Sequence, residues 1–123
     1  MRIRSILAAT IAGLSLVACG QSAPATPSGP VTTVMVSLTD FKIGPAKLTA
    51  PAGNVRFVVS NDGQSPHNLT LNDSNGDRVG ATADLQPHQT GEFTVKLSAG
   101  SYVTFCSLPG HRSLGMEGTL TAT

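Results

Sequence analysis

The stretch Tyr102-Val-Thr-Phe-Cys106-Ser-Leu-Pro-Gly-His111-Arg-Ser-Leu-Gly-Met116-Glu-Gly118 is the most informative part of this sequence. It places a thiol, an imidazole and a thioether close together, with four residues between each neighbouring pair. Residues 102–106 have the side-chain alternation of a strand that ends at the cysteine. The following Pro-Gly pair is a turn signal that can fold the histidine back toward the thiol. The stretch therefore predicts a β fold with potential metal ligands at the end of one strand.

Strand patterns also run through the rest of residues 31–123. Residues 54–60 alternate, with Val55, Phe57 and Val59 on one face, and residues 90–97 alternate in the same way. The run 40–45 predicts a bend between two edge segments because it ends in a proline. We find no helical period of useful length after the N-terminal segment. Short strands separated by turn signals predict an all-β domain, either a β-sandwich or a barrel.

A second imidazole comes from the run Ser65-Pro66-His67-Asn68, which we expect to open a different strand. One thiolate and two imidazoles, with a weak thioether at longer range, form the ligand set of a blue-copper electron-transfer centre. Soft sulfur and imidazole also favour copper over hard cations, which prefer oxygen ligands. The candidate ligands of one mononuclear copper ion are therefore His67, Cys106, His111 and Met116.

Each candidate also has a simpler explanation when it is taken alone. A lone cysteine is most often a small buried apolar residue, a lone methionine fills a core, and a lone histidine usually lies at the surface. The joint spacing of the three loop residues argues against three independent coincidences. The remaining residues of these types are assigned differently. We expect His88, which follows a proline at a predicted hairpin turn, to be exposed, and Met35 to lie in the core.

Residues 1–18 have the pattern of an export signal. Arg2 and Arg4 give a positive start, and the apolar stretch that follows is shorter than the roughly 20 residues that a membrane span needs. The stretch ends in Leu-Val-Ala-Cys19-Gly, which resembles the bacterial lipoprotein signal, in which the cysteine is lipidated and becomes the first mature residue. The alternative is an ordinary signal peptide cut near Ala23 or Ala25, which would discard Cys19.

The sequence then predicts a flexible tether over residues 19–30 and one small domain over residues 31–123. The tether begins at the lipidated cysteine, is rich in proline and has no large apolar residue, so it cannot bury a core. The chain has two cysteines, and with Cys19 in the signal only Cys106 remains as a thiol in the domain. Two of the eight basic residues lie in the signal, leaving six against seven acidic residues. This balance gives no argument for a nucleic-acid partner.

Residues 31–123 resemble a small cupredoxin. The resemblance is carried by the pattern Phe93-Thr-Val-x-Leu-x-x-Gly100-x-Tyr102-x-x-x-Cys106-x-x-Pro109-Gly110-His111-x-x-x-Gly115-Met116-x-Gly118. It implies a Greek-key β-sandwich with copper at one end and with Met116 as the axial ligand. It also implies that Asn68 braces the thiolate loop by hydrogen bonding. The loop spacing is longer than in plastocyanin and resembles that of rusticyanin and sulfocyanin.

The resemblance implies an electron-transfer protein and not an enzyme. We expect a monomer held by its lipid at the outer face of a bacterial membrane, in the periplasm or at the cell surface. Its partners would be transient redox proteins, such as cytochromes or oxidases. Electrons would leave through His111, which the resemblance makes the partly exposed ligand, inside an apolar docking patch formed by Pro66, Leu108, Pro109 and Leu114.

Other functions remain possible at the level of sequence. A copper carrier or delivery protein would use the same four ligands. A multicopper oxidase or a nitrite reductase needs a second copper site with several more histidines, and this chain has three histidines in all. The binuclear copper centre of cytochrome oxidase needs two loop cysteines, and this loop has one. A metal-free adhesion sandwich would not need the loop pattern.

Overall fold

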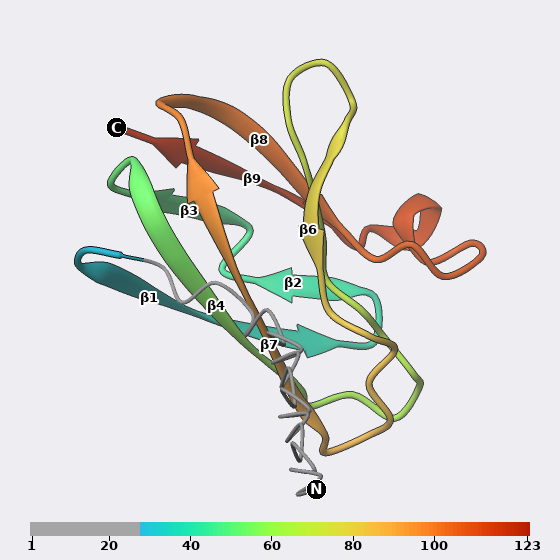
Figure 1. Ribbon diagram of the computed structural model, residues 1–123. Coiled ribbons are helices and arrows are strands. Elements are labelled where there is room, and N and C mark those ends of the chain that lie inside the picture. Colours follow the sequence, from blue (N-terminus) through green and yellow to red (C-terminus); the bar gives the residue numbers. More distant parts are fainter. Residues whose placement is uncertain (1–27) are drawn as a thin grey trace, which may run out of the picture.

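The computed structural model describes residues 28–123, which form a sandwich of two β-sheets (Figure 1). In that range the chain has nine strands and one short 3-10 helix, η1 (Arg112–Leu114). The first sheet has the strand order β2-β1-β4-β7 and the second has the order β3-β9-β8-β5-β6. The predicted all-β sandwich is therefore confirmed, and the barrel alternative is wrong.

The strand bounds follow the alternating segments of the sequence. The first sheet contains β1 (Val31–Thr39), β2 (Lys42–Gly44), β4 (Gly53–Asn61) and β7 (Thr90–Leu97). The second sheet contains β3 (Lys47–Ala50), β5 (Thr70–Asn72), β6 (Arg78–Ala81), β8 (Gly100–Phe105) and β9 (Glu117–Ala122).

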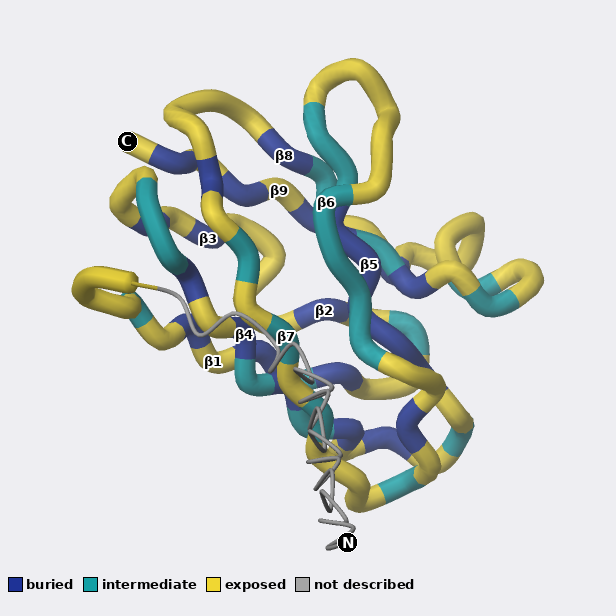
Figure 2. Tube along the Cα trace, viewed as in Figure 1, coloured by how far each residue is buried: buried dark blue, intermediate teal, exposed yellow. Residues whose placement is uncertain are grey.

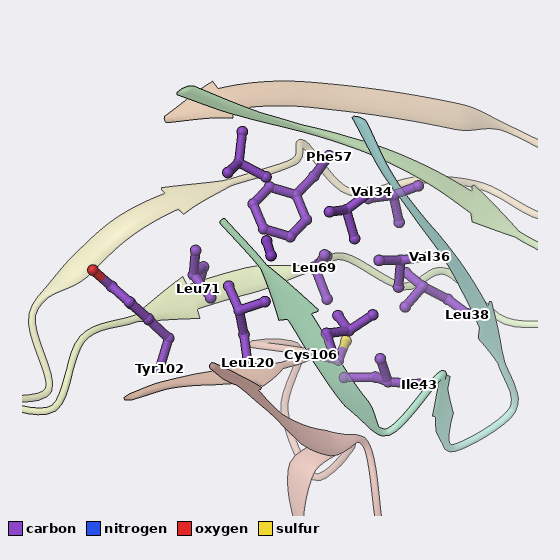
Figure 3. Packing of buried hydrophobic residues seen from close by; sticks show 14 of the residues in the cluster. Val34, Val36, Leu38, Ile43, Phe57, Leu69, Leu71, Tyr102, Cys106 and Leu120 are labelled. Carbon is purple, nitrogen blue, oxygen red and sulfur yellow. The ribbon is translucent and has the colours of Figure 1, made fainter. Parts of the chain in front are cut away.

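The core lies between the two sheets, and side chains reach it from every second position of a strand. Val55, Phe57 and Val59 of β4 are fully buried, as their spacing predicts. Along β9, dark blue buried positions alternate with yellow exposed ones in Figure 2. Figure 3 shows Phe57 of the first sheet facing Leu71 and Leu120 of the second. Burial of these apolar side chains is the main force that holds the sheets together.

Met35 does not lie in the core, so that prediction is wrong. Its side chain is 65% exposed, whereas Val34, Val36 and Leu38 on the same strand are buried. Successive side chains of a strand point to opposite faces, so a strand that buries its even positions must expose residue 35. The alternation therefore outweighs the general tendency of methionine to be buried.

The chain changes sheets between β2 and β3, and each of these strands is an edge of its own sheet. The predicted bend between two edge segments lies at Pro45 and Ala46, whereas residues 42–44, which were also assigned to the bend, form the edge strand β2. Two strand pairs are parallel, namely β1 with β4 and β3 with β9. Because β1 and β4 run in the same direction, the chain leaves both strands at the same end of the sandwich, where Leu38 is aligned with Asn61.

The end of β8 and the start of β5 lie at this same end, which we call the loop end. Phe105 of β8 is paired with Thr70 of β5 and with Glu117 of β9. At the opposite end, Val31 is aligned with Asn54, and the backbone N–H of Thr123 donates to the carbonyl of Ala50. The fold thus gathers residues 40–41, 62–67 and 106–116 at the loop end.

The predicted signal peptide, Cys19 and the tether up to residue 27 lie outside the described residues. The last tether positions are described, and the side chain of Asn54 donates a hydrogen bond of 3.0 Å to the carbonyl of Ser28. Within residues 28–123, no helix has the length and apolar character needed to cross a membrane.

Candidate metal centre

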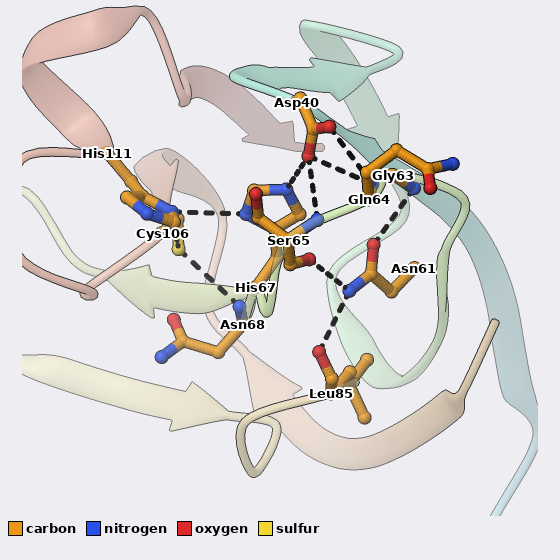
Figure 4. A network of polar contacts seen from close by, with 10 residues as sticks. All are labelled: Asp40, Asn61, Gly63, Gln64, Ser65, His67, Asn68, Leu85, Cys106 and His111. Atoms are coloured by element: carbon orange, nitrogen blue, oxygen red, sulfur yellow. Dashed lines mark hydrogen bonds and ion pairs between the residues drawn. The ribbon is translucent and has the colours of Figure 1, made fainter. Parts of the chain in front are cut away.

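Three candidate ligands meet at the loop end, although they come from distant parts of the sequence. Nδ1 of His67 lies 3.1 Å from Nδ1 of His111, and Sγ of Cys106 lies 3.6 Å from Nδ1 of His111 (Figure 4). The donor atoms of the three side chains all lie within 4.8 Å of one another. Among the described residues this is the one group of three or more His, Cys, Asp or Glu side chains that could hold a metal ion.

These separations fit a single metal ion of the first transition row. Two nitrogens at about 2.0 Å and a thiolate at about 2.3 Å from a metal, at tetrahedral angles, place the nitrogens about 3.3 Å apart. In the same arrangement the sulfur lies about 3.5 Å from each nitrogen. The observed 3.1 Å between the two nitrogens and 3.6 Å between Sγ and Nδ1 of His111 are close to these values, and all three donor atoms lie within 4.8 Å of one another. A thiolate with two imidazoles is also the donor set that suits copper.

His67 reaches this point from a short irregular segment. The sequence predicted a strand that begins at His67, but β5 begins three residues later, at Thr70. His67 instead forms an isolated bridge with Leu85, in which the two backbones exchange hydrogen bonds of 3.0 and 2.7 Å. The bridge fixes the backbone of a histidine whose side chain has no exposed surface.

The sequence predicts a strand that ends at Cys106, and β8 ends one residue earlier, at Phe105. Cys106 is fully buried, and its backbone N–H donates to the carbonyl of Met116 over 3.2 Å. The backbone N–H of Asn68 points at the sulfur, with a separation of 3.5 Å. A donor aimed at sulfur stabilises the thiolate, which is the form that binds a metal.

The loop that follows Cys106 is closed by its own backbone. Gly110 has a φ of 79°, which lets the chain turn so that the N–H of His111 donates to the carbonyl of Leu108. Gly115 ends η1 with a φ of 116°, and the N–H of Met116 then donates to the carbonyl of His111. These backbone hydrogen bonds fix the path of the loop between Leu108 and Met116.

Met116 is fully buried and belongs to the same apolar cluster as Cys106. Its backbone is hydrogen bonded to both Cys106 and His111, so its backbone lies beside these two candidate ligands. Gly118, two residues later, packs closely, because a Cβ there would lie 2.6 Å from the carbonyl oxygen of Ala46. The backbone at this point therefore has room for glycine alone.

Asn68 makes the contacts that its predicted bracing role requires. Its Oδ1 accepts a hydrogen bond of 2.9 Å from the backbone N–H of Ser107, the residue after the candidate thiolate. Its Nδ2 donates to Oγ of Ser107 and to Oδ1 of Asp84, each over 2.8 Å. The side chain thus joins the segment that carries His67 to the loop that carries Cys106.

The third histidine is remote from this cluster. His88 is exposed and has a φ of 68°, and its backbone N–H donates to the carbonyl of Asn61. This confirms the expectation of an exposed turn residue.

Sequence reasoning missed Asp40, which contacts the far side of the His67 ring. Oδ1 of Asp40 lies 2.8 Å from Nε2 of His67. The hydrogen bond to His67 holds the pKa of the Asp40 carboxyl below its ordinary value of 3.8, and the backbone N–H groups of Gln64 and Ser65 act in the same direction. In the sequence, Asp40 stands just after the alternating residues of β1. It comes near His67 only because β1 pairs with β4, the strand that leads to the His67 loop.

Phe41 was also missed. Its ring meets the rings of His67 and His111 edge to face, with centroid separations of 6.1 and 5.1 Å. The residue has a φ of 67°, which is unusual for an aromatic side chain. Phe41 therefore covers the two imidazoles with an apolar ring that limits access of water.

The surface near His111 carries exposed apolar side chains next to the exposed ion pair of Arg112 and Glu117. His111 itself is half-buried, and Pro66, Pro109 and Leu114 beside it in the two loops are exposed. Leu114 is 61% exposed, which makes it one of the few large apolar side chains that are exposed in the described chain. Leu108 is half-buried and packs against the core.

Comparisons with known proteins identify the family and the fold. Residues 8–122 match the family model described as "Cupredoxin-like domain". No curated protein sequence matches the chain.

Several solved structures share the fold, and three of them are auracyanins. Auracyanin B has a TM-score of 0.72 and 24% identity over 82% of this chain and 93% of its own. The dithionite-reduced auracyanin of Roseiflexus castenholzii has a TM-score of 0.69 and 20% identity over 77% and 99% of the two chains. Auracyanin A of Chloroflexus aurantiacus, described as a "blue" copper protein, has a TM-score of 0.69 and 19% identity over 76% and 100%.

At these identities the solved structures establish a shared fold. The family match, in contrast, covers most of the sequence, including the segments that carry His67, Cys106, His111 and Met116. The chain belongs to the cupredoxin-like domain family.

Proposed function

We propose that this protein binds one copper ion through His67, Cys106, His111 and Met116 and transfers single electrons between redox partners. The observation that carries the proposal is the convergence of two imidazole nitrogens and one thiol sulfur, at 3.1 and 3.6 Å, in the buried end of a sandwich. Bound copper supplies a one-electron couple between its Cu(I) and Cu(II) forms.

The chain's own residues would keep the site nearly unchanged between the two oxidation states. Cu(I) and Cu(II) prefer different geometries, so a site that can relax toward each form slows electron transfer. Here the ligand segments are held by backbone hydrogen bonds within the loop and by the Asn68 side chain between the loops. The thioether of Met116 would serve as the weak axial ligand.

His111 is the proposed exit for electrons. It is the one half-buried member of the triad, since His67 and Cys106 have no exposed surface. We propose that Pro66, Leu108, Pro109 and Leu114 form the docking patch around it. A small apolar patch suits transient redox partners, such as cytochromes or oxidases, whose interfaces lie at the small end of the size range.

An absorption spectrum of the copper-loaded protein tests the proposal. We expect the intense blue colour of a copper–thiolate site in the wild type and its loss in Cys106→Ser and His111→Ala. His88→Ala is the matched control, because it removes an exposed histidine and should leave the spectrum unchanged. A colourless wild-type complex, or an equal loss of colour in His88→Ala, would contradict the proposed site.

The same preparation separates an electron shuttle from a copper carrier. A shuttle should give a reversible one-electron wave and keep its metal in the presence of a competing chelator. The full burial of His67, Cys106 and Met116 supports retention of the metal. Rapid loss of copper to the chelator without a reversible wave would instead favour the carrier.

We further propose that the domain is exported and held at the outer face of a bacterial membrane by a lipid on Cys19. Support comes from the lipoprotein-like signal in residues 1–18 and the proline-rich segment after it. Growth of cells with a labelled fatty acid should label the wild type and leave Cys19→Ala unlabelled. An unlabelled wild type would rule out the lipid anchor.

A further inference from the structure

The hydrogen bond between Asp40 and His67 places a negative charge one ring away from the proposed copper. A carboxylate only accepts hydrogen bonds, so the proton of the neutral His67 ring lies on Nε2, which faces Asp40 over 2.8 Å. Nδ1 is then unprotonated and presents its lone pair to the point where the ligands meet. Figure 4 shows the ring lying between Asp40 on one side and His111 on the other.

Asp40 is itself held firmly. The backbone N–H of Gln64 lies 3.1 and 3.0 Å from its two oxygens, and the N–H of Ser65 donates to Oδ1 over 3.1 Å. These groups belong to the loop that leads from β4 to His67. The carboxylate therefore joins the end of β1 to the backbone of the ligand loop as well as to the ligand ring.

Gly63 provides the space for this contact. A Cβ at Gly63 would lie 2.6 Å from Oδ1 of Asp40 and 3.1 Å from Nε2 of His67. The 2.6 Å separation is shorter than real Cβ contacts, so a larger residue would force the carboxylate of Asp40 to move. The φ of Gly63 lies outside the left-handed region, so the backbone conformation does not by itself require glycine here.

We infer that Asp40 is a positioning residue that fixes the tautomer and rotation of His67 and lowers the reduction potential of the copper site. This inference rests on the proposed function. A nearby negative charge stabilises Cu(II) relative to Cu(I), because the oxidised ion carries the larger positive charge. Carboxylates that hold metal-binding histidines orient the ring and make it a stronger ligand.

The apoprotein tests the positioning role without any metal. Nitrogen-15 NMR of the wild type should show His67 with its proton on Nε2. Asp40→Ala should give a mixture of the two tautomers, and Gly63→Ala should shift His67 in the same direction. An unchanged Nε2-protonated ring in Asp40→Ala would overturn the positioning role.

The copper-loaded protein tests the effect of the charge. Asp40→Asn keeps an acceptor oxygen but removes the charge, and we expect the ratio of Cu(II) to Cu(I) affinity to fall about tenfold, which raises the potential by 59 mV. Asp40→Ala should also weaken metal binding about 10- to 100-fold. Asp40→Glu, which retains the charge, should restore most of the wild-type potential.

Asp62→Asn is the matched control. Asp62 is a carboxylate in the same region that accepts hydrogen bonds from Ser37 and Ser60 and makes none to His67. If Asp40→Asn shifts the potential no more than Asp62→Asn does, the inference about the charge is wrong. If the wild type forms no copper–thiolate site, the proposed function fails instead, and the apoprotein spectra still decide whether Asp40 positions His67.

Discussion

At the scale of single residues, the site depends on polar side chains that are not ligands. Asn68, Asp40 and Asn61 each join two backbone segments at the loop end. Asn61, which is fully buried, donates to the carbonyls of Ser65 and Leu85 and accepts from the N–H of Gly63. A buried amide that satisfies several backbone groups fixes their separation, because leaving any of them unpaired costs free energy.

Replacement of Asn68 by alanine should destabilise the apoprotein by about 1–3 kcal/mol. The change leaves the backbone N–H of Ser107 and the carboxylate of Asp84 without their partner. Urea unfolding gives the measurement. Asn75→Ala, at an exposed turn, is the control and should change the stability by less than about 0.5 kcal/mol. Equal unfolding midpoints for the two variants would contradict the bracing role.

Asp62 should make the stability of the protein depend on pH. The hydroxyls of Ser37 and Ser60 donate to its carboxylate over 2.5 and 3.0 Å and hold its pKa below the ordinary 3.8. A lowered pKa in the folded state means that the contribution is present above pH 3.8 and is lost as the pH falls through the folded value.

The apoprotein of Asp62→Asn should therefore be less stable than the wild type at neutral pH. The difference between the two proteins should shrink as the pH falls below 3.8. Urea unfolding at a series of pH values checks this. A difference that grows toward acid pH would have the wrong sign for this carboxylate.

At the scale of elements, the loop from Leu108 to Met116, which contains η1, has two roles. It carries the candidate ligands His111 and Met116, and it presents an exposed surface to the proposed partners. Its backbone closes on itself between Leu108 and Met116, whereas the side chain of Leu114 faces outward. The sequence did not predict η1 because a helix of three residues has no period to detect. The only local signal in the sequence is Gly115, the residue that ends η1 with a positive φ.

Leu114→Ser should slow electron exchange with a redox protein by about 10- to 140-fold, because a leucine that is buried on docking contributes about 1.5–3 kcal/mol. The absorption spectrum and the reduction potential should stay unchanged. Met35→Ser is the matched control, since Met35 is just as exposed but lies on the outer face of β1. Stopped-flow mixing with a soluble cytochrome measures both rates. Equal slowing by the two variants would exclude a specific docking patch.

The elements that the sequence predicts best are those with clear alternation. β4, β7 and β8 appear where residues 54–60, 90–97 and 102–106 predict them. The segment at His67 was predicted less well, because its backbone pairs with Leu85 in a single bridge instead of continuing β5. That partner is set by the packing of loops at the end of the sandwich, which local periodicity does not encode.

At the scale of the whole molecule, copper binding should couple to folding. A metal that binds only the folded state stabilises it by about 4 kcal/mol when the free metal is at 1,000 times its dissociation constant. The thermal midpoint of the wild type should therefore rise when copper is added. The midpoint of Cys106→Ser should rise far less, and that of His88→Ala should rise as in the wild type. An equal rise in all three proteins would indicate binding elsewhere.

The strand pattern predicted an all-β sandwich or barrel, and the resemblance to cupredoxins predicted the sandwich. The sequence also predicted that His67, Cys106 and His111 come together. It could not predict Asp40 and Phe41 as neighbours of His67. Their position requires β1 to lie parallel to β4, and a parallel pair is a long-range arrangement that no short motif specifies. The residues that contact His67 thus depend on the strand topology as much as on the sequence of the loop.

The separation of the two ends of the sandwich has a consequence for electrochemistry. Val31 and Thr123 lie at the end opposite the metal loop, and the nine residues of β1 span about 30 Å (Figure 1). If the protein were attached to an electrode through either of these residues, the copper ion would lie too far from the electrode surface for direct electron tunnelling. Current would then require a dissolved mediator, whereas attachment through Pro109 would bring the ion within reach of the electrode.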